Sequence, residues 1–211
     1  MNKLIFGFFL VIVLSSCQKD EVLIDPFSLD SGTFIDSKDN QEYEWVRIGN
    51  QVWMSENYRY ADTSGSYIYD NLIYNDSVYG KLYSWESALR NEPEGWHLPT
   101  HSEWLELSNY LGGDSLAGGA LKDTSSLWFA DNFGATNESG FKALPGGNFV
   151  YSFNYPEDSY FIGDNTSAYF WTNTKTDLIN IKFISIWYDR LNIVSSYTTR
   201  NDGLSVRYVK D

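Results

Sequence analysis

The stretch that decides the fold is Gly95-Trp96-His97-Leu98-Pro99-Thr100-His101-Ser102-Glu103-Trp104. Thr100 is a good helix N-cap, and Glu103 three residues later completes the pattern of a capping box. Trp104, Leu107 and Leu111 then fall on one helical face. Gly112-Gly113 supplies the left-handed backbone that ends a helix. The stretch therefore predicts a strand or turn that leads into a capped helix over residues 100–111.

The rest of the chain reads as short strands separated by irregular segments. Residues 42–54 alternate polar and apolar around Gly49-Asn50 and predict a hairpin. We expect a first helix over residues 79–89, a loop over 60–78 and a helical turn over 116–122. The further predicted strands cover residues 141–144 (turned by Pro145-Gly146-Gly147), 168–174, 183–191 and 204–209. This pattern predicts an α+β fold with two helices packed on mostly antiparallel strands and long irregular loops.

Several pieces of the sequence together resemble the Fibrobacter succinogenes major paralogous domain family. They keep the family's order from about residue 36 to the end, and they comprise Gly-Trp-His-Leu-Pro-Thr with Glu-Trp (95–104), Ile-Gly-Asn-Gln-Val-Trp-Met-Ser-Glu-Asn (48–57), Tyr-Gly-Lys-Leu-Tyr-Ser-Trp (79–85), Gly-Phe-Lys-Ala-Leu-Pro-Gly-Gly (140–147), Phe-Trp-Thr (170–172) and Val-Arg-Tyr-Val-Lys-Asp (206–211). The resemblance implies a C-type-lectin-like fold, shared with the formylglycine-generating-enzyme group. It implies no general biochemical activity.

Cysteine usage separates this chain from many relatives. Those relatives carry one Cys shortly before Gly-Trp-His-Leu-Pro and another in the terminal Val-Arg-Cys-Val, where this chain has Glu92 and Tyr208. Cys17 is the one cysteine of the sequence. The formylglycine-generating enzymes need cysteines in the C-terminal part of the fold, so the resemblance does not transfer that activity.

The length and the net charge of the chain limit the classes of function that it can have. At 211 residues the chain is long enough for one domain with a substantial core. Its formal net charge of −13 argues against nucleic acid as a partner, because phosphates require clustered Lys and Arg. The same charge argues against binding to an anionic membrane through protein charge alone.

The N-terminus predicts a lipid anchor. Residues 1–16 have a positive start and an apolar run too short to span a bilayer, as a signal peptide does. Leu14-Ser15-Ser16-Cys17 resembles a bacterial lipobox, in which Cys17 is lipidated. The alternative is an ordinary signal peptide with a chance cysteine. Gln18-Lys19-Asp20-Glu21 resembles the surface-export signal of Bacteroidota lipoproteins; the alternative is a charged tether.

These features predict three parts: a signal peptide over 1–16, lipidated Cys17 with a flexible tether over 17–33, and the domain over 34–211. We therefore expect an outer-membrane lipoprotein, lipid-anchored and exposed at the cell surface.

The residues for catalysis are sparse. The only histidines are His97 and His101, and no nucleophile elbow, phosphate-binding loop or zinc-protease motif is present. We expect His97 to be a structural hydrogen-bonding residue and His101 to be exposed at the start of its helix. Pro99 between them disfavours a shared zinc site. The sequence therefore predicts no enzyme.

Calcium is the one cofactor that the sequence leaves open. Oxygen ligands suit it, and lectin-like folds often bind it in their long loops. The candidate ligands flank Trp171 and are Asp164, Asn165, Asn173 and Asp177. The alternative is that these polar residues cap turns.

Aromatic residues make up 18% of the chain and suggest a binding surface. Exposed Trp and Tyr stack on sugars or anchor protein partners. Most of the tryptophans fit core positions, while the candidate ligand-binding residues are Trp128, Tyr151, Phe153, Tyr155, Tyr160 and Trp171. We expect the segment 148–165 to bind a glycan or protein ligand without catalysis. The alternatives are a structural role in a surface assembly or an enzyme on the same scaffold.

Overall fold

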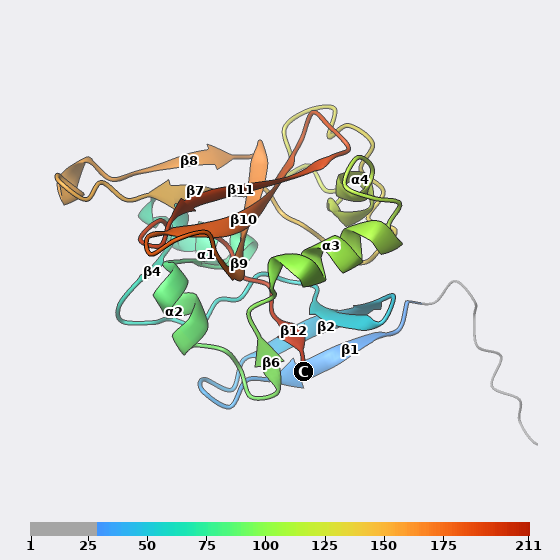
Figure 1. Cartoon of the computed structure of the whole chain (residues 1–211), viewed down its shortest axis with the longest axis horizontal. Helices are drawn as coiled ribbons and strands as arrows, with labels where there is room; N and C mark the ends of the chain where they lie inside the picture. The colour runs from blue at the N-terminus through green and yellow to red at the C-terminus, as the bar shows by residue number, and fades with distance from the viewer. Residues whose placement is uncertain (1–28) are drawn as a thin grey trace, which may run out of the picture.

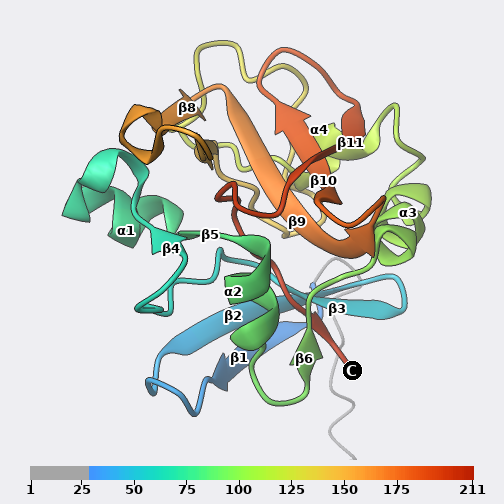
Figure 2. The ribbon, with the colours of Figure 1, turned by 60° about the vertical axis from the view of Figure 1, so that its left-hand side comes forward.

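The computed structural model describes residues 29–211, which form a mixed α/β domain of two curled five-stranded sheets, a two-stranded sheet and four α-helices (Figures 1 and 2). The predicted signal peptide, Cys17 and most of the predicted tether lie outside the described residues. Within residues 29–211, no helix is both long enough and apolar enough to span a bilayer.

The first sheet has the order β1-β2-β3-β12-β6, all antiparallel. Its strands are β1 (Ser31–Ile35), β2 (Glu42–Ile48), β3 (Gln51–Met54), β12 (Val209–Lys210) and β6 (Trp96–His97). The predicted 42–54 hairpin is confirmed, with Gly49 in the left-handed conformation at φ 59°. Strand β1 starts inside the predicted tether, so the expected domain boundary at residue 34 falls too late. Its pairing with β2 is tertiary information that the sequence pattern does not carry.

The second sheet has the order β11-β10-β9-β7-β8. Its strands are β7 (Gly146–Val150), β8 (Tyr160–Asp164), β9 (Ser167–Lys175), β10 (Asn180–Trp187) and β11 (Ile193–Thr199). All pairs are antiparallel except β7 with β9, which pair in parallel at Gly147 and Ala168. The strands predicted over 168–174 and 183–191 correspond to β9 and β10, although β10 begins and ends earlier. The strand predicted over 204–209 is reduced to β12 and isolated bridges, and β11 was not predicted.

Two predictions between residues 60 and 90 are wrong. The expected loop over 60–78 contains β4 (Ser66–Tyr67) and α1 (Ile73–Tyr79), and the expected helix over 79–89 is interrupted. Gly80 ends α1 at φ 71°, and β5 (Leu82–Tyr83) follows it. Ser84 then caps a separate helix, α2 (Trp85–Arg90). The glycine therefore divides a stretch whose apolar spacing alone looks continuous.

The opening stretch folds as its sequence predicts. Helix α3 (His101–Tyr110) starts after Thr100, whose Oγ1 accepts a hydrogen bond from the Glu103 amide at 3.2 Å. The Glu103 carboxylate accepts one from the Thr100 amide at 2.7 Å, which completes the capping box. Gly112 and Gly113 follow in left-handed conformations. Helix α4 (Ala117–Leu121) confirms the helical turn expected over 116–122.

The core lies between the two sheets and under α3. Trp53 of the first sheet packs against Trp104 of α3 with ring centroids 4.8 Å apart, and Phe170 of the second sheet lies 5.5 Å from Trp104. A second, tyrosine-rich cluster surrounds Tyr58 and Tyr208. The opening stretch thus supplies the helix whose tryptophan joins both sheets.

A buried arginine explains why residues 141–144 form no strand. The Arg207 guanidinium is fully buried and donates to the carbonyl oxygens of Phe141 at 2.6 Å and Lys142 at 2.8 Å. It also donates to Met54 O and to Asn57 Oδ1. Lys142 itself has a left-handed backbone at φ 55°, which a regular strand cannot include. The carbonyl groups of this segment are therefore bound by a side chain, and the strand starts only at Gly146.

A buried lysine holds a second set of loops. The Nζ of Lys122 donates to the carbonyl oxygens of Phe133 at 2.7 Å, Arg190 at 3.0 Å and Trp187 at 3.2 Å. Burial lowers the pKa of Lys122 to about 8. The ammonium group therefore ties the loop after α4 to the turn between β10 and β11.

Candidate functional site

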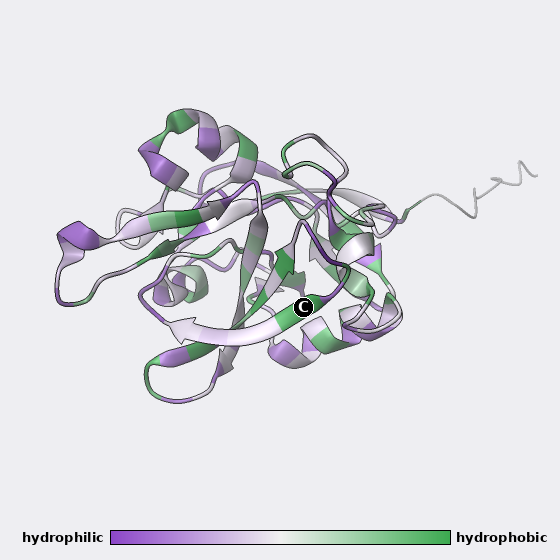
Figure 3. Cartoon of the chain, turned by 90° about the horizontal axis from the view of Figure 1, so that it is seen from above, coloured by the Kyte–Doolittle hydropathy of each residue, from purple (hydrophilic) through white to green (hydrophobic). Residues whose placement is uncertain are grey.

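The candidate site is a groove at the end of the second sheet, which we call the aromatic groove. It has a volume of about 300 Å³ and is lined by Tyr151, Phe153, Ile179, Thr199 and Asn201. Figure 3 shows the β7–β8 hairpin, the end of β11 and the β9–β10 turn projecting on the same side of the molecule. This volume is at the lower end of the range of small-ligand pockets. Although the chain carries a net charge of −13, none of the lining residues is charged.

The apolar side chains of the groove are unusually exposed. Phe153 is 79% exposed and Ile179 is 58% exposed, and next to Ile179 in the same turn Leu178 is 91% exposed. Tyr155 and Tyr160 extend the apolar surface along the β7–β8 hairpin. Leaving such side chains in water forgoes hydrophobic stabilisation, and a grouping of them is typical of a binding surface.

A buried aspartate holds one wall of the groove in place. The Oδ1 of Asp202 accepts a hydrogen bond from the Tyr151 amide at 2.8 Å, and its Oδ2 accepts one from the Thr198 hydroxyl. Next to it, the backbones of Phe149 and Gly203 exchange two hydrogen bonds of 2.8 Å. These bonds join the end of β7 to the segment after β11, so the groove is built on a fixed backbone.

Helix α2 supports the opposite wall. The amide of Trp85, the first residue of α2, donates to the carbonyl of Arg200 at 3.0 Å. The Arg200 amide in turn donates to the carbonyl of Ile179 at 3.0 Å. The position of Ile179 in the groove therefore depends on where α2 lies.

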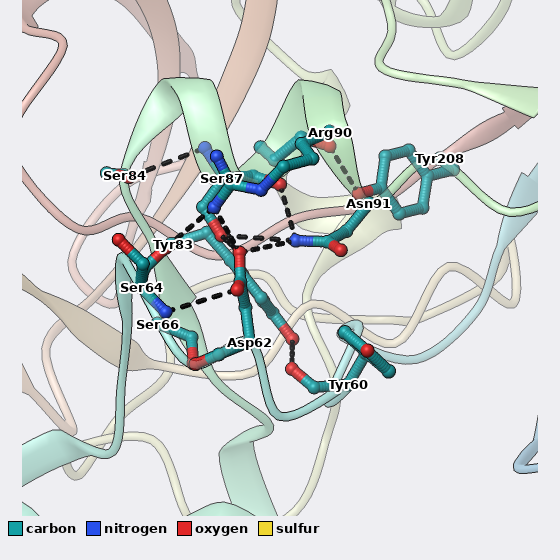
Figure 4. Close-up of polar contacts among 11 residues, drawn as sticks. Tyr60, Asp62, Ser64, Ser66, Tyr83, Ser84, Ser87, Arg90, Asn91 and Tyr208 are labelled. Atoms are coloured by element: carbon teal, nitrogen blue, oxygen red, sulfur yellow. Dashed lines mark hydrogen bonds and ion pairs between the residues drawn. The ribbon is translucent and has the colours of Figure 1, made fainter. Parts of the chain in front are cut away.

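Asp62 fixes α2, as Figure 4 shows. Its Oδ2 accepts hydrogen bonds from Ser87 Oγ at 2.6 Å, Arg90 Nη2 at 2.5 Å and Asn91 Nδ2 at 2.7 Å. Desolvation opposes ionisation of this carboxyl, but the hydrogen bonds from Ser87 and Arg90 outweigh it and lower the pKa of Asp62 to about 2. The network contains a serine hydroxyl but no histidine, so it lacks the base of a catalytic triad. We interpret it as an anchor for α2.

The structure brings together only part of the predicted ligand-binding set. Tyr151 and Phe153 line the groove, and Tyr155 and Tyr160 lie exposed on the same hairpin. The predictions for Trp128 and Trp171 are wrong, because both side chains are buried in the core. The indole N–H of Trp128 donates to Ala143 O at 3.0 Å, and that of Trp171 donates to Tyr83 O at 2.6 Å.

No sequence pattern points to three of the groove residues, which are Ile179, Thr199 and Asn201. They lie in or beside short loops that have no motif, and they reach Tyr151 only because the sheet curls. The polar and aromatic bias of 148–165 was the one sequence signal that pointed to this surface.

The four predicted calcium ligands do not form one site. Asp164 and Asn165 precede β9, while Asn173 and Asp177 lie near its other end. At about 3.3 Å per residue, the strand between them separates the two pairs by roughly 20 Å. Asp177 caps the β9–β10 turn by accepting from the amides of Ile179 and Asn180, both at 2.8 Å. Within residues 29–211 no cluster of three or more His, Cys, Asp or Glu residues could hold a metal.

The two histidines have different environments. His97 bonds through Nε2 to Glu103 Oε1 at 2.8 Å and through Nδ1 to Asp211 Oδ1 at 2.7 Å, which is a structural arrangement as expected. His101 is partly buried, so the expectation of an exposed side chain is wrong, and its Nε2 has no hydrogen-bond partner among the described residues.

Glu92 and Tyr208, the two positions at which the family resemblance implies cysteines in relatives, each make a hydrogen bond. The Leu98 amide donates to Glu92 Oε1 at 2.9 Å. The Tyr208 hydroxyl donates to Ala88 O at 2.6 Å. The two side chains thus fix the loop before β6 and the end of α2 separately, without a covalent link.

Comparison with known proteins identifies one family. The family model described as Fibrobacter succinogenes major domain matches residues 46–210. No curated protein and no solved structure matches the chain significantly.

Proposed function

The chain belongs to the Fibrobacter succinogenes major domain family, and from that premise we propose that it is a non-catalytic binding module whose aromatic groove takes an uncharged ligand with an apolar face. The observation that carries the proposal is the groove itself: exposed aromatic and aliphatic side chains, without a charge, on a backbone fixed by Asp202. The hydroxyl groups of Tyr151 and Thr199 and the amide of Asn201 supply polar groups that can orient such a ligand. A glycan or a protein segment meets this description.

The finer fold assignment is part of the same proposal. We assign the domain to the C-type-lectin-like folds. The supports are the family resemblance, two mostly antiparallel sheets with helices beside them, and long segments without regular structure. In this assignment calcium plays no part in the aromatic groove, because its lining contains no carboxylate.

The proposed location is the outer membrane, with the domain anchored through lipidated Cys17 and displayed at the cell surface. The support is the lipobox-like Leu14-Ser15-Ser16-Cys17 and the acidic stretch after it. Metabolic labelling with radioactive palmitate tests the anchor: the native chain incorporates label and Cys17→Ser does not. Protease treatment of intact cells tests the display, and a protected domain would place it in the periplasm.

The binding role is tested by screening the purified full chain on a glycan array and against a phage-displayed peptide library, each with calcium and with chelator. We expect hits that persist in chelator and are lost in Phe153→Ser and Ile179→Ser. Phe133→Ser is the matched control, since Phe133 is 55% exposed but does not line the groove. Hits that survive both groove substitutions would contradict the proposal, as would silence on both screens.

A further inference from the structure

Strand β11 forms an open edge of the second sheet. All seven of its residues pair with β10, from Ile193 opposite Ile186 to Thr199 opposite Asn180, without a shift in register. Among the described residues, the backbone of Ser195, Ser196 and Tyr197 has no partner outside β10. Alternate residues of an edge strand direct their N–H and C=O groups away from the sheet. At the two ends of β11, Ile193 N donates to Asp114 O and Thr199 O accepts from Asp202 N, so the unpaired donors and acceptors lie in the middle of the strand, at Ser195–Tyr197.

This edge lacks the features that normally protect one. The sequence of β11, Ile-Val-Ser-Ser-Tyr-Thr-Thr, contains no charge and no proline, and it is rich in residues that favour strands. The other sheet edges in residues 29–211 are less suitable. Strand β6 has two residues, β8 contains Gly163 at φ 87°, and the Thr33 carbonyl of β1 accepts a bond from Trp45.

The open edge leads directly to the aromatic groove. Thr199 is the last residue of β11 and lines the groove. Tyr197 lies two residues earlier, hence on the same face of the strand, and is 62% exposed. A strand added beside β11 would therefore carry alternate side chains along Tyr197 toward Phe153 and Ile179. In Figure 3, β11 is the strand that changes from green to pale along its length and ends on the same side of the molecule as the β7–β8 hairpin.

We propose that the ligand of the aromatic groove is an extended, uncharged or basic peptide segment that pairs with β11 as an added strand and places one aromatic or branched aliphatic side chain in the groove. This inference rests on the proposed function and names its partner class. Such recognition draws affinity from backbone hydrogen bonds and specificity from a pocket for alternate side chains.

Two observations favour a peptide over other occupants. A glycan can stack on Phe153, but it has no repeating N–H and C=O groups to match the edge of β11. A second copy of this chain can pair edge to edge, but it brings another net charge of −13 to the interface, which opposes association. An uncharged or basic peptide avoids that repulsion.

The test uses the full chain and a peptide selected on it from the phage-displayed library, synthesised in two backbone N-methylated forms. One form is methylated at even positions and the other at odd positions, so that only one of them loses the N–H groups that face β11. We expect one form to bind at least about tenfold more weakly and the other to bind nearly as the parent does. Phe153→Ser in the protein should lower the affinity for the parent peptide by about tenfold or more, and Phe133→Ser should leave that affinity unchanged.

The outcomes separate this inference from the proposed function. Equal binding of both methylated forms would overturn strand addition while leaving groove binding in place. If glycans bind in a way that requires Phe153 and no peptide is selected, the ligand of the groove is a glycan, and the peptide inference is overturned while groove binding stands. Concentration-dependent dimerisation in sedimentation that is competed by the peptide would support the β11 edge, but dimerisation without any peptide binding would assign the edge to a second copy and overturn the inference.

Discussion

The Nε2 atom of His97 lies 2.8 Å from the Oε1 atom of Glu103, so the last residue of β6 is bound to the residue that closes the capping box of α3. On its other side, the same imidazole bonds to Asp211 beyond β12. Partial burial opposes protonation of His97, but these two hydrogen bonds outweigh it and raise its pKa above 6.5. The first sheet and the helix on which the core is built are thus joined by a titratable contact.

The His97 contact predicts a pH dependence of stability. A base whose pKa is raised on folding contributes fully below its unfolded value of 6.5, and the contribution is lost as pH rises through the folded value. We expect His97→Gln to lower the free energy of unfolding more at about pH 6 than at about pH 9. Urea titrations at the two pH values measure this. His101→Gln is the control, because burial lowers the pKa of His101 and its removal acts in the opposite direction. An equal loss at both pH values in His97→Gln would rule out the titrating contact.

Arg207 predicts a large and geometry-dependent loss of stability. Its guanidinium is fully buried and binds several main-chain oxygens, including those of Phe141 and Lys142, and no carboxylate of residues 29–211 pairs with it. Desolvation lowers its pKa to about 9. Arg207→Met leaves these carbonyls unsatisfied at about 1–3 kcal/mol each, so we expect a loss of at least about 3 kcal/mol. Arg207→Lys should be less stable than the parent but more stable than Arg207→Met, because a single ammonium group cannot reach all the oxygens that the planar guanidinium binds. Denaturant midpoints test the order, and a methionine variant as stable as the parent would show that the arginine adds no net stability.

Replacing Lys122 is predicted to destabilise only the loops that its ammonium group holds together. Its ammonium joins the Phe133 carbonyl to those of Trp187 and Arg190. Lys122→Met keeps the side-chain length but leaves the carbonyls without a donor, so both loops should open more readily. Native-state hydrogen exchange is expected to accelerate at the amide of Phe133, which donates to Tyr188 O, and to be unchanged in β2. Uniform acceleration over the whole domain would indicate global destabilisation instead.

Asp202 predicts a loss of binding without any contact to the ligand. It is 5% exposed and holds the Tyr151 amide and the Thr198 hydroxyl. Asp202→Ala removes both hydrogen bonds, so the Tyr151 backbone should become more mobile and its amide should exchange faster. The affinity for a ligand that binds in the groove should fall by about tenfold. Asp202→Asn should retain part of the affinity, because its one carbonyl oxygen can still accept one of the two bonds. Unchanged affinity in Asp202→Ala would show that the groove does not depend on this aspartate.

The sequence predicted the features that rest on local chemistry. Thr100 and Glu103 are close enough along the chain to cap a helix wherever it packs, and Gly49 with Asn50 turns a hairpin by its own backbone preference. The aromatic bias of residues 148–165 likewise drew attention to the hairpin that carries Tyr151 and Phe153. A prediction from local sequence is wrong where a distant side chain binds the backbone instead. Arg207 donates to the carbonyl oxygens of residues 141–142, and this segment does not form the strand that its composition favours.

By itself, then, the sequence determined the family, the capped helix at its centre, the mixed α/β class and the acidic charge. Only the tertiary structure decided which aromatic residues reach solvent and which residues share a site. Trp128 and Trp171 lie in the core, where their indole N–H groups donate to buried carbonyl oxygens. Ile179 and Thr199, in contrast, line the groove together with Tyr151. The physical reason is that burial and proximity between distant segments follow from how the sheets curl and pack, and no local pattern of residues carries that information.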